Sequence, residues 1–236
     1  MGRRAFPGPA ALRPAAEDRP RRLSLDGQFL VLGCAALAFA SQFWPSSVLL
    51  GRGLAWLGNP PYRGFSGIFL PHLLLYTTFS ACLCALLWLV LAKAGLLPRP
   101  HFGNPGPALT LGIAGGLVLF LIALPVAWLT LPPGSVRWIP PDGWKIAGNL
   151  FSNFYEEFIY RGFLLVALRA VAGFWPAALI SSGLWALLHS QYPVGLRLFI
   201  AIAGIFLCWL ARRARSLTAP YAAHMVLDAM ADSAIG

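Results

Sequence analysis

Residues 153–162, Asn-Phe-Tyr-Glu-Glu-Phe-Ile-Tyr-Arg-Gly, place two adjacent carboxylates and an arginine inside an apolar run from about Trp144 to Leu168. That run is long enough to cross a bilayer, which takes about 20 residues. On a helix, Glu157 and Arg161 share a face and can pair, whereas Glu156 is rotated by about 100° and meets a different neighbour. A carboxylate in a membrane costs at least about 2.5 kcal/mol, so such a group usually has a functional partner.

The composition indicates an integral membrane protein. Hydrophobic residues make up 58% of the chain, charged residues only 11%, and the mean hydropathy is +0.69, whereas soluble domains are about 25% charged. The net charge of +10 does not indicate nucleic-acid binding, because no basic surface domain exists to carry it. Its arginines instead cluster beside apolar runs, as positive-inside topology requires: Arg3, Arg4, Arg13, Arg19, Arg21 and Arg22, then Arg212, Arg213 and Arg215.

The apolar runs predict an all-α fold, a polytopic transmembrane helical bundle of about seven spans. Residues 1–25 lack an apolar period and are expected to form a disordered basic tail. The first run also resembles a signal peptide, with Ala38-Phe39-Ala40 as its cleavage site, but the further spans favour a retained helix. The predicted spans are residues 29–43, 68–92, 109–129, 144–168, 174–189, 196–211 and 217–235.

The distribution of basic residues predicts the orientation of these spans. Lysines and arginines are more frequent in the tail and in alternate loops, which are expected to face the cytoplasm. The amino terminus is therefore expected inside, and an odd number of spans places the carboxyl terminus outside. The expected location is the cell inner (cytoplasmic) membrane.

Three short patterns could carry chemistry. They are Glu156-Glu157-x-x-x-Arg161 in the fourth span, Trp185-x-x-x-His189 at the end of the fifth and His224-x-x-x-Asp228 in the seventh. In the last two, a four-residue step places both side chains on one helical face. Asp232 extends the last stripe by one turn, although a solvated position near the chain end is the simpler interpretation.

Together these patterns resemble the CPBP family of intramembrane proteases, the group of the CAAX prenyl endopeptidase Rce1 and the bacterial Abi proteins. The resemblance covers about residues 144–236, taken as a catalytic transmembrane core. Residues 26–143, the amino-terminal helices, match only in being transmembrane. Two departures occur: Trp185 stands where Phe is usual, and Asp228 stands where Asn is more usual.

The resemblance implies a glutamate-dependent peptide hydrolase. Glu156, assisted by His189, would take a proton from the attacking water, and His224 with Asp228 would stabilise the oxyanion. An ionised Asp228 would repel an oxyanion, so it either carries a proton or orients His224. The Glu157–Arg161 pair would hold the helix in place and maintain the local electric field. An equal alternative is that this buried pair has a purely structural role.

Several alternatives remain open from the sequence. No cofactor is expected, but Glu156, His189, His224 and Asp228 could also bind zinc, although no His-Glu-x-x-His pattern is present. The expected partners are the lipid bilayer and a membrane-anchored or lipidated protein or peptide, with no nucleic acid. The Arg-, Ala- and Pro-rich composition suggests bacterial protein maturation or sorting. Rival functions are a proton-coupled transporter and a non-catalytic scaffold or immunity protein; the oligomeric state is left undetermined.

Overall fold

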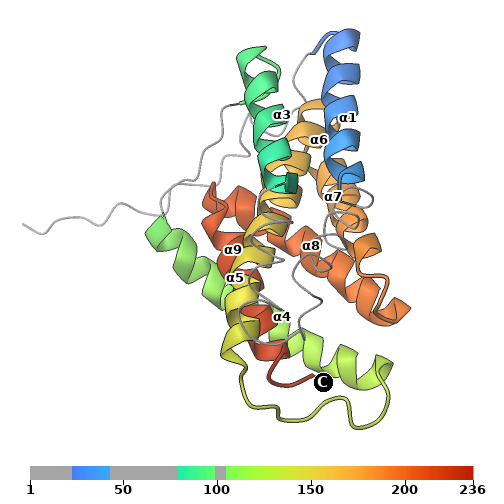
Figure 1. The fold of residues 1–236 in the computed structure, drawn as a ribbon, viewed down its shortest axis with the longest axis vertical. Coiled ribbons are helices and arrows are strands. Elements are labelled where there is room, and N and C mark those ends of the chain that lie inside the picture. The colour runs from blue at the N-terminus through green and yellow to red at the C-terminus, as the bar shows by residue number, and fades with distance from the viewer. Residues whose placement is uncertain (1–22, 43–78, 99–104, 236) are drawn as a thin grey trace, which may run out of the picture.

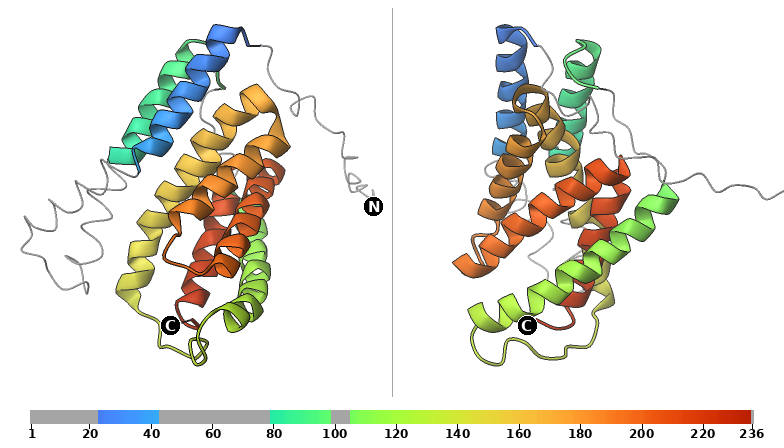
Figure 2. Two further views of the ribbon diagram at one scale, coloured as in Figure 1. Left: turned by 90° about the vertical axis from the view of Figure 1, so that its right-hand side faces the viewer. Right: turned by 180° about the vertical axis from the view of Figure 1, so that it is seen from behind.

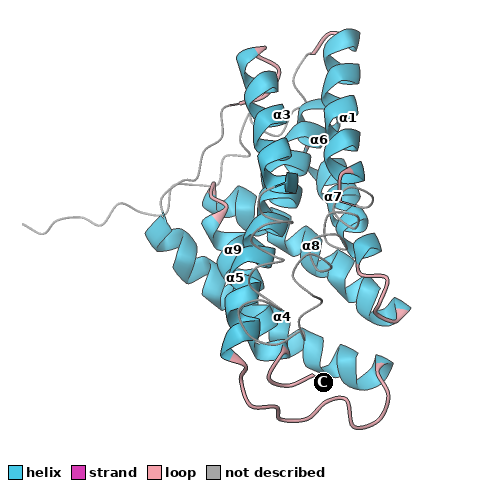
Figure 3. Cartoon of the chain, viewed as in Figure 1, coloured by secondary structure: helices cyan, strands magenta, loops and turns pink. Residues whose placement is uncertain are grey.

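The described part of the chain is a bundle of helices. The computed structural model describes residues 23–42, 79–98 and 105–235, and within these ranges the only β-type pairing is an isolated bridge between Val136 and Ile235 (Figure 3). This confirms the predicted all-α class. The elements are α1 (Leu25–Ala40), α3 (Cys82–Lys93), α4 (Pro105–Thr130), α5 (Gly143–Glu157), η4 (Phe158–Leu164), α6 (Leu165–Ala172), α7 (Phe174–Leu188), α8 (Val194–Ala214) and α9 (Thr218–Ala231) (Figures 1 and 2).

The predicted spans correspond to these helices with small shifts at their ends. Helix α1 begins at Leu25, inside the predicted tail, because the Ser24 hydroxyl caps it by accepting the Gly27 N–H at 3.2 Å. Helix α7 ends at Leu188, so His189 lies just beyond the helix that was expected to contain it. Residues 1–22 of the predicted tail and residues 68–78 of the second predicted span lie outside the described residues.

Two helices, α4 and α8, are long and apolar enough to cross a membrane. Many of their large apolar side chains point outward, whereas a soluble helix turns most such side chains toward the protein core. The buried positions of α4 are mostly glycine and alanine, which allow close helix approach in a membrane. The exposed positions of the two helices include Leu121, Trp128, Leu129, Leu198 and Ile202.

The stretch that carries the two glutamates lies at the centre of the bundle. Helices α5 and α6 are joined by the π-helical turn η4 into one continuous helical segment. The Asp142 side chain caps its start, and Gly173, with φ of +83°, ends it. This segment contacts α1, α3, α7, α8 and α9. Turns of π-helix often mark functional sites, and this one contains Arg161.

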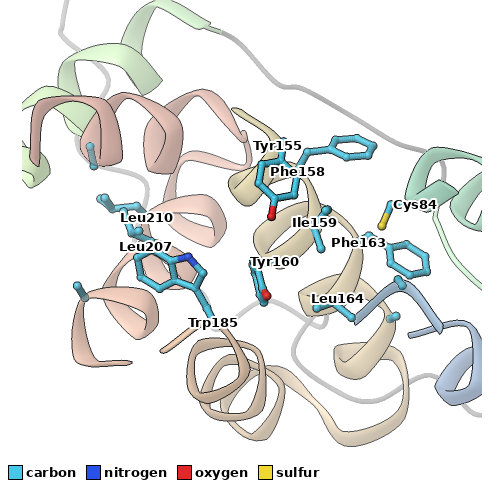
Figure 4. Packing of buried hydrophobic residues seen from close by; sticks show 14 of the residues in the cluster. Cys84, Tyr155, Phe158, Ile159, Tyr160, Phe163, Leu164, Trp185, Leu207 and Leu210 are labelled. Atoms are coloured by element: carbon cyan, nitrogen blue, oxygen red, sulfur yellow. The ribbon is translucent and has the colours of Figure 1, made fainter. Parts of the chain in front are cut away.

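The core forms around this segment. Ile159, Tyr160 and Phe163 are each 0% exposed, and Figure 4 shows them between α3 on one side and Trp185 on the other. Full burial of these large side chains fixes how the segment is rotated about its axis, since a rotation would lose the many van der Waals contacts that each of them makes. The rotation in turn decides where the glutamates point.

Helices α4 and α9 pack in parallel through small residues. A Cβ added at Gly112 would clash with the backbone oxygen of Ala219, and one at Gly116 would lie 2.5 Å from the backbone oxygen of Ala223. Both helices thus present small residues four positions apart, which brings their backbones together. Because α9 carries His224 and Asp228, this contact positions part of the candidate site.

We therefore expect Gly116→Ala to lower the free energy of unfolding by about 1–3 kcal/mol, because the added methyl group must push α9 away. Thermal unfolding in detergent would measure the effect. The matched control is Gly183→Ala on α7, where an added Cβ meets nothing within 4 Å. Equal stability of the two variants would contradict the proposed close contact.

Candidate active site

A buried ion-pair network joins two of the sequence patterns. Arg161 Nη1 donates to Glu157 Oε1 at 3.0 Å, which confirms the predicted pair. The same carboxylate oxygen lies 2.8 Å from Nδ1 of His224, a residue 67 positions further along the chain. All three side chains are at most 4% exposed. Since an ionised carboxylate only accepts hydrogen bonds, Nδ1 of His224 is the donor.

Glu156 points to a different neighbour, as its rotation on the helix predicted. Its Oε2 accepts the indole N–H of Trp185 at 2.6 Å. The backbone oxygen of Trp185 lies 2.9 Å from Nδ1 of His189, and the two rings meet edge to face at 5.2 Å. A carbonyl oxygen can only accept, so Nδ1 carries the proton and Nε2 of the neutral ring is the basic nitrogen.

Asp228 completes the set from the last turn of α9. Its Oδ2 lies 3.5 Å from Nε2 of His224, and its side chain is 32% exposed. The four-residue spacing therefore does place both groups on one face. At this distance the two atoms are not tightly bonded, so the Asp228 carboxyl group can turn toward a third group.

Trp185 lies at the centre of the arrangement, and the sequence interpretation missed this role. It gave Trp185 only a packing function. In the structure the indole donates to Glu156, its ring meets His224 edge to face at 5.2 Å, and Arg161 lies over its face at 4.1 Å. Phe, the usual residue at this position, has no indole N–H. The presence of Trp185 was therefore the sequence signal that could have revealed this hydrogen bond.

The six predicted residues divide by accessibility. Glu157, Arg161 and His224 are buried, whereas Glu156, His189 and Asp228 are partly exposed. Only the second group reaches the surface of the described residues, and we call the surface formed by Glu156, His189 and Asp228 the opening. The first group forms the support behind it, so Glu157 does more than pair with Arg161, because it also holds His224.

Tyr192, in the connection between α7 and α8, lies over His189, one of the accessible groups. It is 42% exposed, and its ring stacks on that of His189 at 6.1 Å with an interplanar angle of 14°. Partial burial, followed by the nearby Asp228 carboxylate, raises the pKa of the Tyr192 hydroxyl. The phenol therefore stays a neutral hydrogen-bond donor beside the opening.

Asp232 lies next to this opening but has partners of its own. Its carboxylate pairs with Lys145 and accepts a hydrogen bond from Asn149 at 2.9 Å. The Lys145 and Asp232 side chains are 51% and 23% exposed. This pair connects the start of α5 to the end of α9, consistent with the expected solvated position of Asp232.

The geometry does not fit the zinc ligand set considered from the sequence. The two ring nitrogens of His224 face Glu157 and Asp228, and Glu156 is bonded to Trp185. Among the described residues, no three His, Cys, Asp or Glu side chains converge as metal ligands. A tetrahedral zinc site needs such convergence, so each step of the mechanism proposed for this site uses protein side chains.

Comparison with known families agrees with the site. Residues 143–230 match the family described as Rce1-like, or Type II CAAX prenyl endopeptidase Rce1-like. The match runs from the start of α5 nearly to the end of α9 and includes all seven residues named in the three patterns. No curated protein and no solved structure matches the chain. The helical core that carries the site therefore resembles the Rce1-like family of CAAX prenyl endopeptidases, which supports a membrane protein with a CAAX-protease-like endopeptidase core.

Proposed function

We propose that this protein is a glutamate-dependent intramembrane endopeptidase that acts on a membrane-anchored or lipidated polypeptide in bacterial protein maturation or sorting. One observation carries the proposal. Glu156 and His189 bond to Trp185, Asp228 lies beside His224, and these three partly exposed groups are backed by the buried ion-pair network. This is the arrangement that water activation and oxyanion binding require.

Glu156 and His189 would activate the attacking water together. The indole N–H occupies Oε2 of Glu156, so we assign the other carboxylate oxygen, Oε1, to the water. The basic Nε2 of His189 would accept a hydrogen bond from the same water. Glu156 would take the proton as the water oxygen attacks the peptide carbonyl, and could then deliver it to the leaving amine.

His224 and Asp228 would stabilise the oxyanion that forms in this attack. Nδ1 of His224 is held by Glu157, which leaves Nε2 as the group directed at Asp228 and at the opening. A proton on either Nε2 or the Asp228 carboxyl would serve as a donor to the oxyanion. Each such donor is worth about 3 kcal/mol in the transition state.

Cleavage by the purified protein tests the proposal directly. The protein would be incubated in detergent with membrane-anchored candidate polypeptides, with and without a chelator. We expect cleavage that persists in the chelator. Cleavage that stops on chelation would contradict the metal-independent mechanism, and no cleavage of any candidate would favour the non-catalytic scaffold.

The transporter alternative receives less support from the geometry. A proton relay needs ionisable groups spaced through the whole membrane depth. Here Glu156, His189 and Asp228 gather toward one end of the bundle. The opposite side of the core is filled by Phe163 and Leu164, which are at most 1% exposed.

The role of Asp228 gives a pH-dependent prediction. If the carboxyl group donates to the oxyanion, it must be protonated, so wild-type activity falls as pH rises through the pKa of Asp228. An amide donates at any pH. We therefore expect Asp228→Asn to retain activity and to extend it to alkaline pH. The measurement is a pH–rate profile of both proteins; a uniform loss in the variant would instead mean that the ionised carboxylate orients His224.

A further inference from the structure

The two ends of the bundle differ in charge. Three of the described helices, α3, α6 and α8, end with basic residues in their last turns, and two contacts between helix ends lie on this side. Arg212, near the end of α8, lies 4.5 Å from the ring of Phe174, the first residue of α7. Gly27, at the start of α1, lies beside Leu96, just after α3. The basic residues of this end are Lys93, Arg169, Arg212, Arg213 and Arg215.

The candidate site lies toward the other end. The Lys145–Asp232 pair joins the start of α5 to the end of α9, and the Arg137 N–H donates to Ala234 O beside it. Asp228 precedes the end of α9 by three residues, which is about 4.5 Å of helix. Trp185 is equally close to the end of α7. Figure 2 shows the start of α5 and the carboxyl terminus at the same end, away from the start of α1.

The core closes any path from the basic end to the site. Between the two lie Ile159, Phe163, Leu164, Leu207 and Leu210, each at most 1% exposed. Such a close-packed apolar layer admits neither water nor a polypeptide. Substrate must therefore arrive from the end where Glu156, His189, Tyr192 and Asp228 are exposed.

The positive-inside rule then assigns a side to each end. In the sequence, three further arginines, Arg19, Arg21 and Arg22, come shortly before α1, which begins at the basic end. Among the described residues the site end carries three basic residues, Arg137, Lys145 and Arg197, against five at the basic end. An excess of Lys and Arg near helix ends marks the cytoplasmic side, so the site end faces away from the cytoplasm.

We infer that the active-site opening lies on the non-cytoplasmic side of the membrane, and that the substrate is a membrane-anchored polypeptide whose cleavage segment has been exported. The substrate class in this inference rests on the proposed function. The side of the membrane on which the opening lies does not, because it follows from helix ends and basic residues. A cytoplasmic lipidated tail would meet the basic, closed end of the bundle. It could not reach Glu156 without crossing the bilayer.

The opening can be located without measuring activity. Ser190→Cys places a thiol on the exposed loop between α7 and α8, and Ala172→Cys places one at the exposed, opposite end of α7, beside Gly173. Both variants would be treated with a membrane-impermeant thiol reagent in intact spheroplasts and after lysis. The wild type measures background from the four native cysteines, of which Cys82 is exposed on the apolar helix α3.

We expect Ser190→Cys to react fully in intact spheroplasts and Ala172→Cys to react only after lysis. The reverse pattern, or reaction of both before lysis, would overturn the assigned side. Labelling needs no catalysis, so an inactive protein with the expected pattern would refute the proposed function alone. In the same strain, a candidate anchored with its cleavage segment outside should be cut, and the same segment anchored inside should stay intact.

Discussion

Replacing Glu156 with glutamine is expected to abolish cleavage, with a loss of at least about 10²–10⁴-fold, the range that a general base contributes. The amide has nearly the shape of the carboxylate, and its oxygen can still accept the Trp185 indole N–H that now bonds Oε2 at 2.6 Å. Packing should therefore survive, whereas proton abstraction from water should not. The measurements are the cleavage rate, together with the unfolding temperature to show that the fold is intact.

The matched control is Asp232→Asn. This residue is also an acidic side chain at the same end of the bundle, but it pairs with Lys145 and Asn149 outside the catalytic set. Losing a partly exposed ion pair costs about 0–1 kcal/mol, so rate and stability should stay near wild type. Substantial activity in Glu156→Gln would remove Glu156 from the mechanism; equal losses in both variants would indicate a nonspecific charge effect.

Arg161→Ala is expected to lower the free energy of unfolding by about 3–5 kcal/mol, because it leaves the buried Glu157 carboxylate without its guanidinium partner. The arginine side chain is 0% exposed, and its guanidinium also lies over the Trp185 ring. Expression and unfolding temperature should fall together with turnover. Lys145→Ala, which breaks the exposed pair with Asp232, is the control and should change stability by about 0–1 kcal/mol.

A double variant separates the structural role of the buried ion pair from its role in catalysis. Glu157→Gln combined with Arg161→Met removes both buried charges and retains most of the side-chain volume. Such replacements are often neutral or stabilising, so much of the stability lost in Arg161→Ala should return. Cleavage should remain low, because Nδ1 of His224 would lose its carboxylate acceptor. Full stability of Arg161→Ala with only turnover reduced would instead place Arg161 in the chemistry.

Local spacing predicted the parts of the site that lie on one helix. The four-residue step from Glu157 to Arg161, the step from His224 to Asp228 and the separate direction of Glu156 all follow from helical geometry. The apolar runs likewise predicted the helical class and most helix positions. These features depend on neighbours within about one turn, which a single sequence displays.

Contacts between distant helices could not be read in the same way. The bond between Glu157 and His224 depends on how α5 and α9 are rotated and packed, and the sequence sets this only through the whole core. The same holds for Trp185, whose indole meets Glu156 across α7 and α5. Tyr192 stacks on His189 because the short connection after α7 turns back over the site. Such a turn has no repeating residue pattern from which it could be predicted.

The π-helical turn at Phe158–Leu164 has a consequence for how sequence changes act on this helix. A π-turn has one more residue than an α-turn, and one residue corresponds to a rotation of about 100°. The positions on either side of it therefore follow two different heptad phases. Helix α5 contacts α9 and helix α6 contacts α1, so the turn sets how each half of the segment faces its own neighbour. A single-residue deletion within the turn would merge the phases and swing α6 by more than a quarter of a revolution, while the carboxylates of α5 stayed in place.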